Sequence, residues 1–143
     1  MEELEALRKL VEDQNYESAL VLIDEMDEMA KDDKINKIES FLEILLIHLI
    51  KQHAEKRSTN SWERSIANAL RGIYKSNKRR ESKGFYLNQN DLQNAIEESY
   101  SFALKEAAQE SFGGAFSAKV LSEMVDSEAI KEESLNKILN YEV

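Results

Sequence analysis

Apolar residues recur at helical spacing along most of the chain and predict an all-α protein. Near the start, Leu4, Leu7 and Val11 share one helical face. After a break at residues 14–15, a second apolar stripe lies opposite acidic side chains. This stripe consists of Ala19, Leu20, Ile23, Met26 and Met29. We expect the two helices to form an antiparallel hairpin.

The longest helix is expected to follow this hairpin. We predict a joint at residues 31–34, where Asp33 has the chemistry of an N-cap, and a helix from there to about residue 57. Its apolar side chains cover almost the whole circumference between residues 35 and 50. A helix that is apolar all round is typical of the centre of a bundle. The sequence therefore predicts that Leu45–Leu49 lies in the core.

Two further helices are predicted from capping patterns. Asn60 and Glu63 have the spacing of a capping box, which predicts a helix from residue 62 to about residue 80. Asn90 and Gln93 repeat the pattern and predict a helix that ends before Gly113. Between these two helices, residues 85–87 are expected to fold back onto the bundle.

Short helical segments are expected at residues 116–124, around residue 130 and at residues 135–139. We predict a single all-α bundle, with about five main helices in residues 1–112 and a helical tail in residues 113–143 that docks in the same domain. The absence of proline and the presence of only four glycines favour helix throughout.

Several segments resemble a known family. Residues 7–28 (LRKLVEDQNYESALVLIDEMDE) look like its opening hairpin. Residues 38–51 are similar to its leucine-rich helix with an embedded His and a closing Lys. Ser61-Trp62, the helix that follows it and residues 100–110 also fit in order and spacing. The chain thus resembles the "domain of unknown function twenty-nine" family of small bacterial proteins, which is abundant in cyanobacteria.

This resemblance covers roughly residues 1–112. Two departures stand out: Gln52 replaces a common aromatic residue, and an acidic tail replaces a C-terminal motif with Pro and Cys. The resemblance implies a helical bundle and no known activity. It therefore transfers no catalytic residue.

Composition excludes several classes of protein. Without cysteine, the chain has no disulfide, no thiolate nucleophile and no Cys-ligated metal site. The longest apolar run, residues 44–50, is much shorter than the ~20 residues of a membrane span. The N-terminus lacks the pattern of a signal peptide. We expect a cytoplasmic protein that does not bind membranes.

No motif points to catalysis or to a cofactor. The Glu-x-x-His pairs of di-metal bundles are missing. His48 and His53 are five residues apart, about 140° around a helix, and cannot chelate one ion from the same helix. We expect no catalytic residue, metal ligand or cofactor. His48 is interpreted as a polar residue of the core, with a ligand or switch role as the alternative.

Charge is strongly segregated along the chain. Residues 51–83 contain ten basic and three acidic residues, whereas residues 1–50 contain five and fourteen. The candidate face for binding a partner, called the basic face below, consists of Arg64, Arg71, Lys75, Lys78, Arg79 and Arg80. In one interpretation, the basic face binds an acidic protein or a phosphate backbone. In the other, its positive charges balance the negative charges of acidic helices within the bundle.

The tail carries a second candidate surface. Phe116, Val120, Leu121 and Met124 belong to an apolar strip that packs either on its own bundle or on a second chain. The sequence favours a non-enzymatic protein-protein interaction module that binds another protein, or forms a homodimer, through the basic face or the tail. A nucleic-acid-associated protein is the alternative, and a metal-dependent or hydrolytic enzyme is the third.

Overall fold

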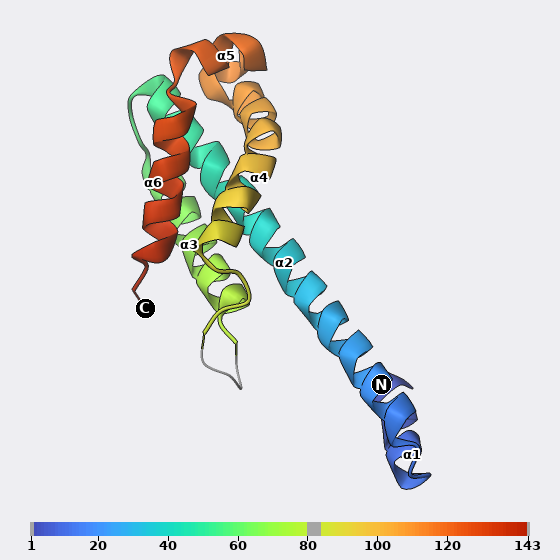
Figure 1. Ribbon diagram of the computed structural model, residues 1–143. Helices are drawn as coiled ribbons and strands as arrows, with labels where there is room; N and C mark the ends of the chain where they lie inside the picture. The colour runs from blue at the N-terminus through green and yellow to red at the C-terminus, as the bar shows by residue number, and fades with distance from the viewer. Residues whose placement is uncertain (1, 80–83, 143) are drawn as a thin grey trace. The chain divides into compact units, whose positions relative to one another are not determined.

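The computed structural model describes residues 2–79 and 84–142 (Figure 1). Every regular element in these residues is a helix, apart from one isolated β-bridge between Lys78 and Phe85. The prediction of an all-α protein is therefore confirmed. The chain forms two compact units, residues 1–34 (the N-terminal unit) and residues 35–143 (the bundle). Our boundary at residues 112–113 stays a prediction.

The N-terminal unit is a helical hairpin. It consists of α1 (Glu2–Glu12) and the first part of α2 (Tyr16–Glu55). The turn places Gln14 at φ 61°, and the Asn15 amide donates to the Leu10 carbonyl at 2.8 Å. The Asn15 side chain accepts from the Ser18 amide at 3.4 Å. A local cap and a left-handed residue thus reverse the chain between two helices.

One prediction about this region is wrong. Residues 31–34 are not a joint, and Asp33 is not an N-cap, because α2 continues through them without a break to Glu55. The segment is polar but contains neither Gly nor Pro, and its lysines are good helix formers. Charge alone does not end a helix when each backbone amide still finds the carbonyl four residues before it.

The bundle has its core on the second part of α2. Residues of α2 that are fully buried there include Ile38, Leu42, Leu45, Leu46, Leu49 and Ile50. They pack with buried residues of α3 (Asn60–Asn77) and α4 (Gln89–Glu110). The predicted core at Leu45–Leu49 is confirmed. Ile44 is 39% exposed, so this helix is covered on most of its surface but not all round.

Close packing explains the glycine inside α3. A Cβ atom on Gly72 would stand 2.5 Å from ring atoms of Phe41. Glycine costs helix stability, because it gains conformational freedom in the unfolded chain. Here it lets the aromatic ring of α2 lie directly against the backbone of α3.

The caps of α3 and α4 differ from the predicted ones. The N-cap of α3 is Thr59 and not Asn60. Its side chain accepts a hydrogen bond from the Trp62 amide at 3.1 Å. Asn88 and Asp91 form the capping box of α4, two residues before the predicted pair. At the start of α3, Thr59 competes with neighbouring Ser and Asn residues for the cap, and at the start of α4 Asn88 competes with Asn90. The packing of the helix decides between them.

The tail folds back onto the bundle through a 3₁₀ turn, η1 (Ser111–Gly114). Phe112, Gly113 and Gly114 all have positive φ there, which explains the two glycines. Two helices follow, α5 (Ala118–Met124) and α6 (Ser127–Leu139). The two segments expected around residue 130 and at 135–139 are thus one helix. Leu121 and Ile130 are fully buried in the core, and α6 lies beside α3 and α4 (Figure 1).

None of the helices in the described part of the chain combines the length and apolar character that a membrane span requires.

A test of the core compares two leucines of the bundle. Leu45→Ala should lower the free energy of unfolding by about 2–5 kcal/mol, because it leaves a cavity at a fully buried site. Leu139→Ala, at a site that is 44% exposed, should cost less than about 1 kcal/mol. Urea unfolding followed by the fluorescence of Trp62 measures both. Equal losses in the two variants would contradict the assignment of the core.

Candidate functional site

Five members of the basic face are described by the structure, and all five are exposed. Arg64, Arg71 and Lys75 lie on one side of α3, because spacings of seven and four residues are nearly whole helical turns. Lys78 and Arg79 follow directly after the helix. Arg80 lies outside the described residues. Within the described part of the chain, none of these five side chains forms an ion pair.

Aromatic side chains surround the C-terminal end of this face. Lys78 Nζ lies 5.7 Å from the ring centre of Tyr74, and the guanidinium of Arg79 lies 5.1 Å from that of Tyr86. The Tyr74 ring also contacts the rings of Phe85 and Tyr141, at centroid distances of 6.1 and 5.4 Å. The result is a surface that mixes cations and aromatic rings.

Asn77 fixes the chain that carries this surface. Its side chain is buried, accepts from the Leu87 amide at 2.7 Å and donates to the Leu87 carbonyl at 3.2 Å. The Tyr86 amide donates to the Asn77 carbonyl at 2.8 Å. Residues 85–87 do fold back as predicted, with Leu87 in the core, whereas Phe85 is exposed. Sequence analysis missed Asn77, because its partner Leu87 lies ten residues further along the chain.

A cavity of about 140 Å³ opens beside residues 85–89. Its walls include Tyr74, Phe85 and Tyr141, together with Ile73 and Leu92. This is far below the ~300–1,000 Å³ of typical ligand pockets. Its size suits one ring rather than a whole cofactor.

The other cations of the predicted basic segment are used differently. Lys51 is buried, with Nζ 3.4 Å from Glu110 and 4.8 Å from the ring centre of Trp62. Arg57 also lies 4.8 Å from that ring, and it pairs with Glu55 at 2.9 Å. These two cations pair with acids of the bundle, Lys51 from a buried position and Arg57 from an exposed one. The segment thus divides into a paired part and the exposed basic face.

His48 is half-buried, and its Nδ1 lies 2.8 Å from the Ile44 carbonyl of the same helix.

Glu43, also on α2, has a raised pKa. Partial burial of its carboxyl raises the pKa most, and the negative charges of Glu39 and Glu106 raise it further. No group of three or more potential metal-binding side chains occurs in the part of the chain that the structure describes. The role of His48 stays a prediction.

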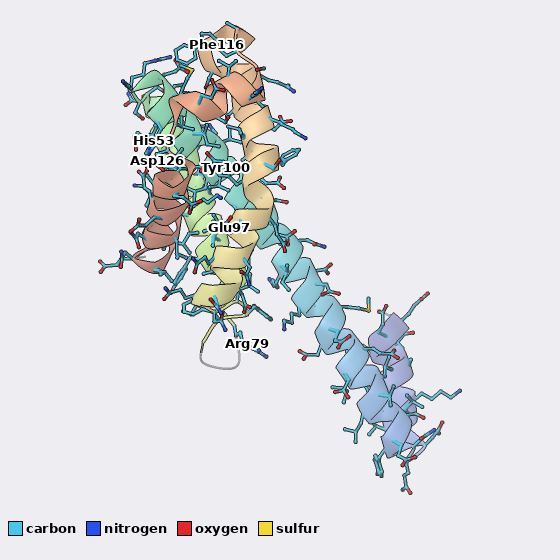
Figure 2. The ribbon with its side chains drawn as sticks, turned by 45° about the horizontal axis from the view of Figure 1, so that its top comes forward. His53, Arg79, Glu97, Tyr100, Phe116 and Asp126 are labelled. Atoms are coloured by element: carbon cyan, nitrogen blue, oxygen red, sulfur yellow. The ribbon has the colours of Figure 1, made fainter. Side chains whose placement is uncertain are left out.

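Polar contacts that the sequence did not predict connect α6 to the rest of the bundle. His53 Nε2 lies 2.7 Å from Glu133, and Lys131 Nζ lies 2.9 Å from Glu97. The residues of each pair are 80 and 34 positions apart in sequence. No local signal marks them, because they depend on how α6 packs. His53 belongs to α2 and Glu97 to α4 (Figure 2), so the two pairs connect α6 to two different helices.

Tyr100 lies at the centre of this contact. Burial, together with the charges of Asp126 and Glu128, raises the pKa of its phenol to about 12 (Figure 2). The Lys131 amine lies 4.9 Å from its ring centre. The hydroxyl oxygen is buried and has no hydrogen-bond partner among the described residues.

The N-terminal unit presents a second surface. Seven of its large apolar side chains are between 44% and 62% exposed, namely Leu4, Val11, Tyr16, Leu20, Val21, Ile23 and Met29. Ala19 is the only buried residue among residues 2–34 of the described chain. The stripe expected to pack within the hairpin is therefore mostly uncovered, because α1 has only 11 residues and is too short to cover it.

Acidic side chains surround these apolar residues. Residues 2–34 contain twelve acidic and four basic residues. None of them forms an ion pair within the described residues. A shallow groove on α1, with Leu4, Leu7 and Val11 as its apolar lining, is also lined by Glu5, Arg8 and Glu12. The unit combines uncovered apolar surface with uncompensated negative charge.

The tail strip is divided between two environments. Leu121 and Ile130 point into the core, whereas Phe116, Val120 and Met124 are 39–40% exposed. Phe116 contacts Phe112 with a ring distance of 5.2 Å. Phe116 and Arg79 lie at opposite ends of the bundle (Figure 2).

Comparison with known proteins gives one match. A family model described as "Domain of unknown function DUF29" matches residues 2–133. No curated protein matches the chain. No solved structure matches it either.

Tyr100→Phe should raise the free energy of unfolding by about 1 kcal/mol at neutral pH, because it removes a buried hydroxyl without a partner. The wild type should lose stability as the pH rises from 10 towards 12. The tyrosine then ionises in the unfolded chain, at its ordinary pKa of 10.0, but stays protonated in the folded one. Tyr100→Phe should weaken this dependence, and urea unfolding across this pH range measures it.

The matched control is Tyr16→Phe, at an exposed phenol. It should leave the free energy of unfolding at neutral pH unchanged. The pKa of Lys131 is also raised, mainly by its hydrogen bond to Glu97. Lys131 therefore also contributes a loss of stability as the pH rises. Some dependence should therefore remain in Tyr100→Phe, and an unchanged profile would contradict the role of Tyr100.

Proposed function

We propose that this chain, which belongs to the DUF29 family, is a protein-protein interaction module. The description of the family names no activity, so the proposal rests on the surface of the molecule. One observation carries the proposal. The N-terminal unit leaves seven large apolar side chains exposed on one small hairpin. Single exposed apolar residues are ordinary, but such a concentration marks a surface that another molecule covers.

The packing of the bundle supports this interpretation. In the bundle the apolar residues of α2 are buried by α3, α4 and the tail. In the N-terminal unit the same helix continues with apolar residues, but it gains only α1. Helices of this kind owe most of their stability to packing of an apolar face. A partner that covers the N-terminal unit would bury the apolar side chains that α1 leaves exposed.

A photo-crosslinking amino acid at position 20 tests this function. Leu20 is 62% exposed, so its replacement should leave the fold intact. In nuclease-treated cells it should form a crosslink to a distinct protein. The same group at position 102, where Phe102 on α4 is 49% exposed, should not form that crosslink. Absence of any crosslink at position 20, or identical products from both positions, would overturn the proposal.

Nucleic-acid binding is the second candidate. It is supported by the basic face, where five exposed cations make no ion pair within the described chain and aromatic rings lie beside them. Single-stranded nucleic acids bind surfaces of this composition, with phosphates on cations and bases stacked on rings. The acidic remainder of the chain opposes this at long range, but salt screens it beyond ~8 Å.

This candidate predicts that labelled single-stranded RNA or DNA binds with an affinity that falls steeply with salt. The double variant Arg71→Glu/Lys75→Glu should then weaken binding by more than about tenfold. Lys105→Glu changes an exposed lysine of α4 and should have a small effect. Fluorescence anisotropy measures all three proteins. Equal binding by both charge-reversal variants would remove the basic face as a nucleic-acid site.

A further inference from the structure

The surface of the N-terminal unit indicates the chemistry of its partner. This inference rests on the proposed function. We propose that the hairpin of α1 and the first part of α2 binds a cationic amphipathic helix of another protein. Three features support this partner: the spacing of the apolar residues, the charge around them, and the lack of a matching surface within residues 2–79 and 84–142.

The exposed apolar residues have the spacing that a helix recognises. Tyr16, Leu20 and Ile23 occupy positions i, i+4 and i+7 on α2, so they form one stripe. Leu4 and Val11, seven residues apart, form a second stripe along the groove of α1. A helix that docks on such a hairpin presents its own apolar residues at the same intervals. α1 is about 16 Å long, which matches about three turns of a partner helix.

The charge around the stripes defines the polar face of the partner. Glu5 and Glu12 border the groove on α1 together with Arg8, so its lining keeps an excess of acid. Asp24 and Asp27 follow the stripe on α2. None of these carboxylates has an ion-pair partner in the described chain. Lysine and arginine residues beside the apolar residues of a partner helix would compensate them and speed its association.

The same charges argue against a second copy on this surface. Residues 2–34 carry eight more acidic than basic side chains, so a symmetric dimer would bring two such units together. Like charges across an interface are costly and discriminate against the wrong partner.

The chain's own basic face is not a suitable occupant either. It has the correct charge, but the apolar residues of α3, such as Ile66 and Ile73, are buried in the core. The face therefore combines its cations with a few aromatic rings, such as the exposed Phe85, but not with a stripe of apolar residues at helical spacing. A head-to-tail contact between two copies would leave the apolar stripes of the hairpin uncovered.

The test uses the full chain and three labelled peptides of about 18 residues, long enough for a helix. One peptide carries leucines at helical spacing among lysines, and the second carries the same leucines among glutamates. The third has the composition of the first in scrambled order. Fluorescence anisotropy should show binding of the first peptide at least about tenfold tighter than that of the other two.

Variants that keep the charge test the apolar stripe. Leu20→Gln/Ile23→Gln should weaken the binding of the lysine peptide by about tenfold or more. Phe102→Gln, a matched change at an exposed position of the bundle, should not. Asp24→Asn/Asp27→Asn should weaken the binding and reduce its dependence on salt, whereas Glu98→Gln on α4 should leave both unchanged.

Four results would overturn the inference. They are equal binding of the lysine and scrambled peptides, equal or tighter binding of the glutamate peptide, no effect of Leu20→Gln/Ile23→Gln, and self-association in sedimentation that this variant abolishes. The last result would make a second copy the occupant. A crosslink from position 20 to a distinct protein, together with failure of the lysine peptide, would leave the proposed function standing and reject only the cationic helix.

Discussion

The length of α2 is the constraint on which the rest of the structure depends. It has 40 residues, whereas α3 has 18 and α4 has 22. An α-helix buries its apolar face only where another element lies against it. From Ile38 to Ala54 the bundle provides such elements, and the buried residues of α2 all lie there except Ala19. In the N-terminal unit, α1 is the covering helix, and it is too short to bury more than Ala19 fully.

This constraint explains how much of the fold was predictable. The leucines at 45, 46 and 49 identify the core, because their spacing and density admit no other environment. The continuity of α2 was missed, since residues 31–34 were interpreted by charge and not by helix propensity. The caps at Thr59 and Asn88 were each displaced by one or two residues, because neighbouring Asn residues have the same capping chemistry. Short-range chemistry indicated that a helix begins, and tertiary packing determined where.

The candidate surfaces were predictable to different degrees. The members of the basic face follow directly from composition and helical spacing. Their exposure and lack of ion pairs within the described chain required the structure, since Lys51 and Arg57 belong to the same sequence segment yet are paired. The hairpin surface was not predicted, for a related reason. Sequence analysis placed Leu20 and Ile23 on one apolar stripe, but periodicity only shows that residues share a face and does not show what covers it.

The separation of charge now has a physical interpretation. Where acids and bases meet inside the bundle, as in Lys131 with Glu97, they hold α6 against α4 and help to order the tail. In the N-terminal unit no such compensation exists among the described residues, and the acids lie beside apolar side chains that the unit cannot bury. Exposed charge alone keeps a helix solvated, and exposed apolar surface alone favours any hydrophobic neighbour. Their combination on one hairpin restricts the neighbour to one that is apolar and cationic at helical spacing, which gives the surface specificity as well as affinity.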